Sequence, residues 1–330
     1  MGRIKSILRY LLLSFGVALL IVACNTPQPN AQQESQTNQT QKVEVSNENQ
    51  ININTAILSE LDKLESELNI PALSDKIQAN RPYGSTEDLV TKNVITSEQF
   101  EKIKNQVTVR EIALTGVAKD VDYLTKLGLM KGHMMVAEEL LDLNKPKQAD
   151  PHLGHPVEEI YADIEEQLND RQVTQFSNVL TGVQELVKSN PKSPQVKTNF
   201  NRAMEAIENA IAALPESERK SPTFVLKAIN GILDVAAYEY KAAIHDGKIV
   251  EIIEYQDSRG FVEYSKDVLY KNIAPELSKI DPKANEQLKT DLEELFKAWP
   301  SPIAPKQAVL SPETVTAKVK SIGKVSRSIT

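Results

Sequence analysis

The sequence predicts an all-α protein in which a small helical module is followed by one or two helical bundles. Three observations support this fold class. Runs typical of strands are nearly absent, apolar residues recur at the i, i+3 and i+4 steps of a helix, and most of the 17 prolines lie between these patterns. With 330 residues and 41% hydrophobic content, the chain is long enough to form two or three domains with ordinary cores.

Residues 1–23 have the parts of a bacterial export signal. Arg3, Lys5 and Arg9 precede an apolar run that ends at Ala23 and is too short for a committed transmembrane helix. Cys24, the only cysteine of the chain, follows at once. This ending resembles a lipoprotein lipobox, which implies that Cys24 is diacylated, with palmitate as an acyl group, and anchors an exported protein to the periplasmic or other extracytoplasmic face of a bacterial membrane. A plain signal peptide followed by a chance cysteine is the alternative.

Residues 24–50 have the composition of a disordered tether. Gln, Asn, Ser and Thr dominate this segment, so it has too little apolar surface to offset the entropy that folding costs. The net charge of −7 for the whole chain argues against a protein that coats nucleic acid. Because the single thiol would be used by the lipid, a metal site has to be built from His, carboxylate, Met or Tyr side chains.

Residues 51–111 have the pattern of several short helices. Asn54 or Thr55 is the expected cap of a helix that runs through Leu64, and capping-box sequences at 85–88 and 96–99 begin two more. The segments NINTA, PALSDKI, RPYGSTEDLV and TSEQFEKIKNQVTV together resemble a tandem helix-hairpin-helix domain. Such domains occur in the ComEA-type competence DNA receptor and in the small extrinsic subunit of photosystem II, so the resemblance implies a role in binding either DNA or a partner protein.

Two features of this segment disfavour DNA binding. DNA-binding hairpins have a Gly-hydrophobic-Gly turn, because glycine lets backbone amides approach a phosphate closely. The corresponding residues are 68–70 and 94–96, and neither turn contains glycine. Residues 51–111 also hold seven Lys and Arg against ten Asp and Glu, a net charge of −3, whereas nucleic-acid modules usually have a basic face. Docking of a partner protein is therefore favoured.

The rest of the chain is predicted to be helical in two regions, 112–214 and 215–330. Pro215 breaks the pattern between them, either as a boundary between two bundles or as a crossover within one. Helical periodicity and breaker residues predict helices at 115–127, 129–143, 157–168, 173–188, 195–214, 222–245, 284–298 and 312–322.

Three of the four histidines lie within one short stretch, between Met130 and Tyr161. His133 shares a helical stripe with apolar residues and is expected to point inward. His152 and His155 lie in the segment 151–156, which is expected to be a tight turn between two helices. Imidazoles and carboxylates from facing helices are the groups from which bundles build transition-metal sites.

The ligands that we expect are His133, His152, His155, Glu159 and Glu138. Glu159 follows His155 by four residues and should share its helical face, with Glu158 as the competitor. The ion would be iron or copper, or the iron of haem. A purely structural interpretation also stands, since histidines beside a Pro-Gly turn often cap helices and neighbouring glutamates are usually solvated.

The segment YKAAIHDGKIVEIIEYQ, residues 240–256, resembles the extracytoplasmic helical part of some bacterial iron permeases. The resemblance centres on residues 246–248 and 254–255 and implies a role in iron handling. Because the permease's own membrane helices are missing, transport is not implied.

These observations favour an exported, membrane-anchored lipoprotein that binds a transition metal or haem through a His/Glu cluster. The alternatives are a non-catalytic structural or assembly factor that docks a partner protein through residues 51–111, and, as the less favoured one, a competence-type DNA receptor. The sequence has no G-x-S-x-G, no H-E-x-x-H and no free thiol, so a binding protein is favoured over an enzyme. A histidine-carboxylate site would nevertheless be able to do redox or hydrolytic work.

Overall fold

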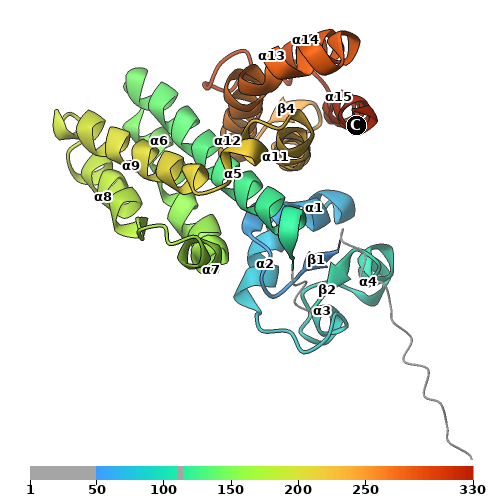
Figure 1. Ribbon diagram of the computed structural model, residues 1–330. Coiled ribbons are helices and arrows are strands. Elements are labelled where there is room, and N and C mark those ends of the chain that lie inside the picture. Colours follow the sequence, from blue (N-terminus) through green and yellow to red (C-terminus); the bar gives the residue numbers. More distant parts are fainter. Residues whose placement is uncertain (1–49, 110–113, 330) are drawn as a thin grey trace, which may run out of the picture. The chain divides into compact units, whose positions relative to one another are not determined.

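The computed structural model describes residues 50–109 and 114–329, which lie in one compact unit (Figure 1). The predicted signal peptide, Cys24 and nearly all of the predicted tether lie outside the described residues. The all-α prediction is confirmed, and every strand in the described ranges is two residues long. Within the same ranges, none of the helices combines the length and the apolar character needed to cross a membrane.

A hairpin module with its own apolar core occupies residues 51–109. It consists of α1 (Leu58–Leu68), α2 (Leu73–Ala79), α3 (Asp88–Thr91) and α4 (Ser97–Ile103). Strands β1 (Ile51–Asn52) and β2 (Val107–Thr108) pair in parallel and hold the two ends of the module together. Its fully buried side chains include Ile53, Leu61, Leu64, Leu73 and Ile77.

The first helix of the module begins later than predicted. Asn54 and Thr55 do not cap it, because α1 starts at Leu58 and residues 51–52 form a strand. The side chain of Asn54 is used elsewhere: its amide oxygen accepts from the Tyr83 N–H at 2.7 Å, and its amide nitrogen donates to the Tyr83 carbonyl at 2.9 Å. This pairing ties the start of the module to the loop between α2 and α3.

The capping box predicted at 96–99 is present in full. The Thr96 hydroxyl accepts from the Gln99 N–H at 3.2 Å, and the Gln99 side chain accepts from the Thr96 N–H at 2.8 Å. The box at 85–88 forms only in half, since Asp88 accepts from the Ser85 N–H but α3 begins at Asp88 itself without a side-chain cap.

We expect Thr96→Ala to lower the free energy of unfolding by about 1 kcal/mol, because one N–H at the start of α4 loses its acceptor. Thr290→Ala is the control, since Thr290 is exposed in the interior of a helix, where alanine is the better helix former. Thermal unfolding of both variants checks the prediction. Equal melting temperatures would show that the box does not contribute.

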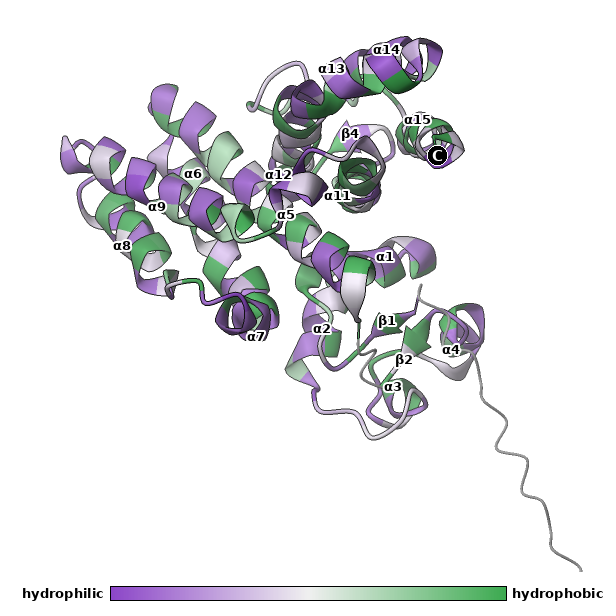
Figure 2. Cartoon of the chain, viewed as in Figure 1, coloured by the Kyte–Doolittle hydropathy of each residue, from purple (hydrophilic) through white to green (hydrophobic). Residues whose placement is uncertain are grey.

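One continuous apolar core joins the helices of 112–214 and 215–330. These elements are α5 (Gly116–Asp142), α6 (Pro146–His155), the π-helix η1 (Pro156–Tyr161), α7 (Ala162–Asp170), α8 (Ser177–Ser189), α9 (Gln195–Ala212), α10 (Glu216–Arg219), α11 (Pro222–Ala242), β3 (Ile244–His245), β4 (Lys248–Ile249), α12 (Ile252–Tyr264), the π-helix η2 (Ser265–Tyr270), α13 (Lys271–Ile280), α14 (Pro282–Phe296) and α15 (Pro312–Ser328). Figure 2 shows α11 as hydrophobic over most of its visible length, whereas α9 alternates between hydrophilic and hydrophobic residues.

Helix α5 is the central element of this core and packs against α6, α9, α11 and α12. Two helices were expected here, at 115–127 and 129–143, but the structure has one. Gly128 does not interrupt it, because its bare Cα faces the side chains of Ile232 and Tyr264, where a Cβ would crowd both. Tertiary packing therefore outweighs the weak helix propensity of glycine.

The tight turn expected at 151–156 is helical instead. Pro146 lies in the first turn of α6, where its missing N–H costs nothing, and Pro151 continues the helix. Pro156 then begins η1. A proline ring clashes with the carbonyl four residues earlier, and the wider i→i+5 spacing of a π-helix relieves that clash. The chain thus passes from α6 through η1 into α7 without a turn.

Helix α11 ends at Ala242, three residues before the predicted end at 245. A β-hairpin begins there instead, with Ile244 paired to Ile249. Asp246 and Gly247 have φ values of 50° and 74°, as a two-residue hairpin turn requires.

Candidate metal centre

Two neighbouring helices bring three histidines together in the core. His133 lies in the middle of α5 and is 1% exposed. His152 and His155 lie three residues apart at the end of α6, so they share one face of that helix. The ring centroids of His133 and His155 are 5.0 Å apart. The prediction that His133 points inward agrees with its burial, and the predicted proximity of the three rings agrees with these distances.

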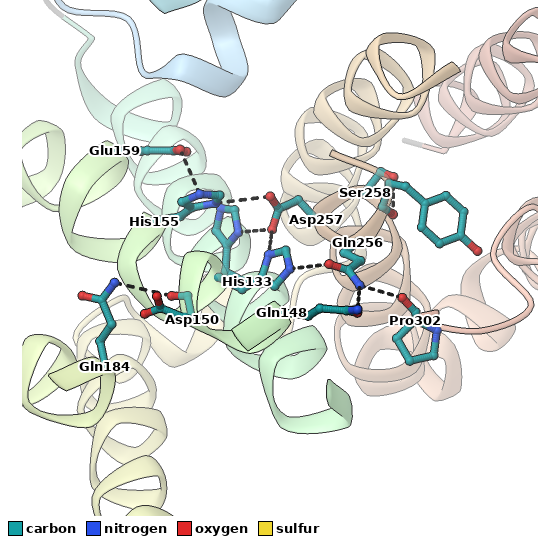
Figure 3. A network of polar contacts seen from close by, with 12 residues as sticks. His133, Gln148, Asp150, His155, Glu159, Gln184, Gln256, Asp257, Ser258 and Pro302 are labelled. Carbon is teal, nitrogen blue, oxygen red and sulfur yellow. Dashed lines mark hydrogen bonds and ion pairs between the residues drawn. The ribbon is translucent and has the colours of Figure 1, made fainter. Parts of the chain in front are cut away.

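The carboxylate that faces these rings belongs to Asp257 of α12, which is not among the ligands expected from the sequence. Its Oδ1 lies 2.5 Å from His133 Nδ1 and 2.7 Å from His152 Nδ1, and its Oδ2 lies 3.2 Å from His155 Nδ1. In Figure 3, dashed lines join the Asp257 carboxylate to the histidine rings, which lie to one side of it. Among the described residues, these four form a group whose potential ligand atoms all lie within 4.8 Å of one another. We call them the His/Asp cluster.

Two glycines allow α12 to come close enough to α5 for these contacts. Gly260 lies against the backbone of Gly132, and a Cβ on Gly260 would overlap the Gly132 carbonyl. A Cβ on Gly132 would lie 2.9 Å from the backbone nitrogen of Phe261 and 3.0 Å from the carbonyl carbon of Gly260. Since Gly132 precedes His133 and Gly260 follows Asp257 by about one turn, this backbone contact determines how far the cluster's two sides are apart.

A hydrogen-bond chain determines the orientation of His152. The amide nitrogen of Gln256 donates to Gln148 Oε1 at 3.2 Å and to the Pro302 carbonyl at 2.8 Å, so its oxygen is the atom that faces His152 Nε2 at 2.9 Å. His152 Nε2 must therefore carry a proton. In a neutral imidazole the other nitrogen, Nδ1, then has a lone pair, which is the form that binds metal ions.

His133 has an unsatisfied nitrogen. Its Nδ1 faces Asp257, while its Nε2 is buried without a hydrogen-bond partner. The Phe261 ring packs edge-on against the His133 ring, with the two ring centroids 4.8 Å apart. A buried polar atom without a partner is uncommon and is frequently explained by an ion or by chemistry at the site.

The electrostatics of the cluster are those of one anion shared by three bases. Burial opposes ionisation, but the three imidazoles hold the pKa of Asp257 well below its usual range. Burial lowers the pKa of His133. Burial acts against a charge on His155 too, yet the Asp257 carboxylate overrides it and raises the pKa of His155 to about 10. The site thus favours positive charge around Asp257.

The two predicted glutamates lie in different places. Glu159 is at the edge of the cluster, with its Oε1 3.7 Å from His155 Nε2 (Figure 3), while its competitor Glu158 is exposed. Glu138 is not near the histidines in this structure, because its carboxylate pairs with Lys197 of α9. The fourth histidine, His245, is exposed on β3.

The comparisons with known proteins match two parts of this chain. Residues 215–330 match an iron permease-associated 4-helix bundle domain. Residues 46–108 match a helix-hairpin-helix motif, so both resemblances noted in the sequence are confirmed. The search of curated proteins and the search of solved structures gave no match. The segment that matches this domain contains Asp257, whereas all three histidines of the cluster lie before its first residue.

Proposed function

We propose that this protein binds a divalent transition-metal ion at the His/Asp cluster and takes part in iron handling. The observation that carries the proposal is the convergence of four ligand-type side chains from α5, α6 and α12 within 4.8 Å in the core. Imidazole nitrogen and carboxylate oxygen are suitable donors for iron, copper and zinc ions. The match of 215–330 to an iron permease-associated domain favours iron among these ions.

The hydrogen bonds of His152 support a cation rather than protons at this place. If no cation is bound, His133 and His152 must both donate from Nδ1 to the same oxygen of Asp257. His152 would then carry protons on both nitrogens, since Nε2 already donates to Gln256. A cation between the rings and the carboxylate would replace these protons and let each imidazole stay neutral.

The arrangement favours a single ion over haem. The four potential donor atoms lie within 4.8 Å of one another, which leaves no space for a planar macrocycle between them. Glu159 lies at the margin, where it contacts His155 and is able to act as an additional ligand or as a hydrogen-bond acceptor.

We place this function at the outer face of a bacterial membrane. The lipobox-like ending at Cys24 and the match to an iron permease-associated domain support this location, with the lipid as the anchor and a permease as the partner. We expect Cys24→Ser to move the protein from the membrane fraction to the soluble fraction of cells that express it. Retention of the variant in membranes would contradict the lipid anchor.

Metal analysis of the mature chain, purified without a histidine tag, tests the binding site. We expect about one equivalent of Fe²⁺ or Co²⁺ per chain, added without oxygen, and none in the His133→Ala/His152→Ala double variant. His245→Ala is the matched control, since it removes an exposed histidine outside the cluster's helices and should retain full binding. A metal-free wild type, or binding that survives the double variant, would overturn the proposal.

The orientation of His152 gives a further prediction. Gln256→Leu removes the acceptor of His152 Nε2 but no proposed ligand. We expect the affinity for Co²⁺ to fall about 10- to 100-fold, the usual effect of losing such a supporting hydrogen bond. A titration followed by visible absorption measures it, and an unchanged affinity would show that the ring is oriented by packing alone.

A further inference from the structure

A cavity of about 440 Å³ lies next to the His/Asp cluster. His155, Glu159 and Asp257 contribute to its wall from the cluster side. The hairpin module contributes another part of the wall, with Asp62 and Ser66 of α1 and Ser74 of α2. The cavity therefore leads from the module to the proposed metal ligands.

The charged side chains that line this cavity are mostly acidic. Besides Glu159 and Asp257, it includes Asp62, Glu65, Glu239 and Glu254. The lining also contains Lys241, whose ammonium group donates a hydrogen bond to the backbone carbonyl of Ser66 at 2.6 Å. The Glu65 carboxylate already has hydrogen-bond partners, since it accepts from the backbone N–H of Ala72 and from the Ser74 hydroxyl.

Glu239 has no such partner, although it is only 4% exposed. It lies on α11 and lines the cavity, and no hydrogen bond or ion pair satisfies its carboxylate among the described residues. The Ser66 hydroxyl, on a residue 6% exposed, is also buried without a partner in the same lining. A buried carboxylate without a counter-charge is costly, and such groups are normally paired or bound to a cation.

The raised pKa values of the carboxyl groups in the cavity agree with a site that lacks its cation. Burial, together with the neighbouring carboxylates, raises the pKa of Glu239 well above its usual range, and the same causes raise the pKa of Asp62 despite its hydrogen bond from Ser74. The pKa of Glu254 is raised to about 7, again mainly by burial. A cation in the cavity would reverse these shifts.

We propose that the cavity holds a hydrated divalent cation on its way to the His/Asp cluster, with α1 of the hairpin module as its outer wall. This inference rests on the proposed metal-binding function. The cation keeps its water shell, because Asp62, Glu239 and Glu254 do not belong to the group of donors that lie within 4.8 Å of one another. Roughly 180 Å³ is needed for six waters at about 30 Å³ each, so the cavity has room for such an ion. The hairpin module then covers the path of the metal ion and contributes acidic side chains to it.

The test compares the rate of Co²⁺ uptake, followed by visible absorption in a stopped-flow instrument, in wild type and in Asp62→Asn/Glu239→Gln. The new amide on α1 would keep an acceptor for Ser74, and the new amide on α11 would replace a buried carboxyl group of the same shape, so the variant should fold. We expect uptake at least about tenfold slower, with the same final spectrum, since the variant lacks two carboxyl groups that would ionise to hold the entering cation. Glu165→Gln/Glu166→Gln removes two carboxyl groups from the exposed side of α7 and is the control. Equal rates in both double variants would overturn the inference.

Mn²⁺ separates this inference from the proposed function, because it prefers oxygen ligands. In a His152→Gln background, where the cluster is impaired, electron paramagnetic resonance should still detect weakly bound hydrated Mn²⁺. This signal should disappear when Asp62→Asn/Glu239→Gln is added. No bound Mn²⁺ in the background variant would overturn the cavity site. A wild type that binds Mn²⁺ in the cavity but no Co²⁺ at the histidines would support the cavity and refute the proposed metal centre.

Discussion

Gly260→Ala should separate α12 from α5 and thereby weaken both the fold and the metal centre. The added Cβ would overlap the Gly132 carbonyl, and neither backbone is able to yield without moving its helix. Overpacking in a core costs about 1–3 kcal/mol, and a clash between two backbones belongs at the upper end of that range. His133 would move away from Asp257 at the same time, so Co²⁺ binding should weaken by a factor of about 100 or more, which corresponds to about 2.7 kcal/mol.

Urea unfolding and Co²⁺ titration measure the two effects. Gly182→Ala is the control, because Gly182 lies in α8 and a Cβ there would meet nothing within 4 Å. That substitution should stabilise the protein by up to about 1 kcal/mol through helix propensity alone. A Gly260→Ala protein as stable as wild type would mean that the contact between α5 and α12 is not close in solution.

Asp257→Asn should abolish tight metal binding and also destabilise the metal-free protein. The variant keeps the shape of the side chain but removes the charge that faces all three imidazoles. Breaking a buried ion pair by removing one partner typically costs about 3–5 kcal/mol. The expected result is loss of the Co²⁺ spectrum together with a lower melting temperature of the metal-free protein.

The stability difference between wild type and Asp257→Asn should depend on pH in a defined direction. The carboxylate raises the pKa of His155 to about 10 in the folded state, above the value near 6.5 expected in the unfolded chain. A raised imidazole pKa stabilises the fold fully below about pH 6.5, and this contribution is lost as the pH rises toward about 10. The Asp257 pKa is depressed, so its own contribution is lost in strong acid.

The difference in melting temperature should therefore be largest near about pH 5–6 and smaller at about pH 9. The lowered pKa of His133 has the opposite effect on how stability changes with pH. His133 is present in both proteins, so its effect is reduced when their melting temperatures are compared. A difference that grows from mildly acidic to alkaline pH would contradict the assignment of a charged pair between His155 and Asp257.

The sequence predicted the histidine side of this centre because His133 lies on an apolar stripe and because three histidines lie close along the chain. Glu138 lies apart from the His/Asp cluster for a geometric reason. It lies five residues from His133, which places it about 140° further around the helix at about 100° per residue. Its carboxylate accordingly reaches Lys197 at the surface and not the cluster.

Asp257 could not be found by the same reasoning, because α12 has no apolar stripe. Gln256, Asp257, Ser258 and Arg259 are all buried, and each is satisfied by partners far away in the sequence. The Arg259 guanidinium, for example, pairs with Glu139 and donates to the Trp299 carbonyl. Hydrophobic periodicity identifies a helix that has one apolar face and one solvent-exposed face. Along these residues α12 has no solvent-exposed face. The segment that resembles iron permeases ends at residue 256, one position before Asp257.

The π-helix η1 joins α6 to α7 within one continuous run of helix. A π segment holds one residue more than an α-helix of the same span, so everything after it is rotated by about one residue step, or about 100°. Before η1, His152 and His155 face Asp257 of α12. After η1, Ile164 and Leu168 pack into the apolar core. The additional residue of η1 thus changes the rotation of α7 about the helix axis relative to α6. One run of helix thereby contributes histidines to the His/Asp cluster from α6 and apolar side chains to the core from α7.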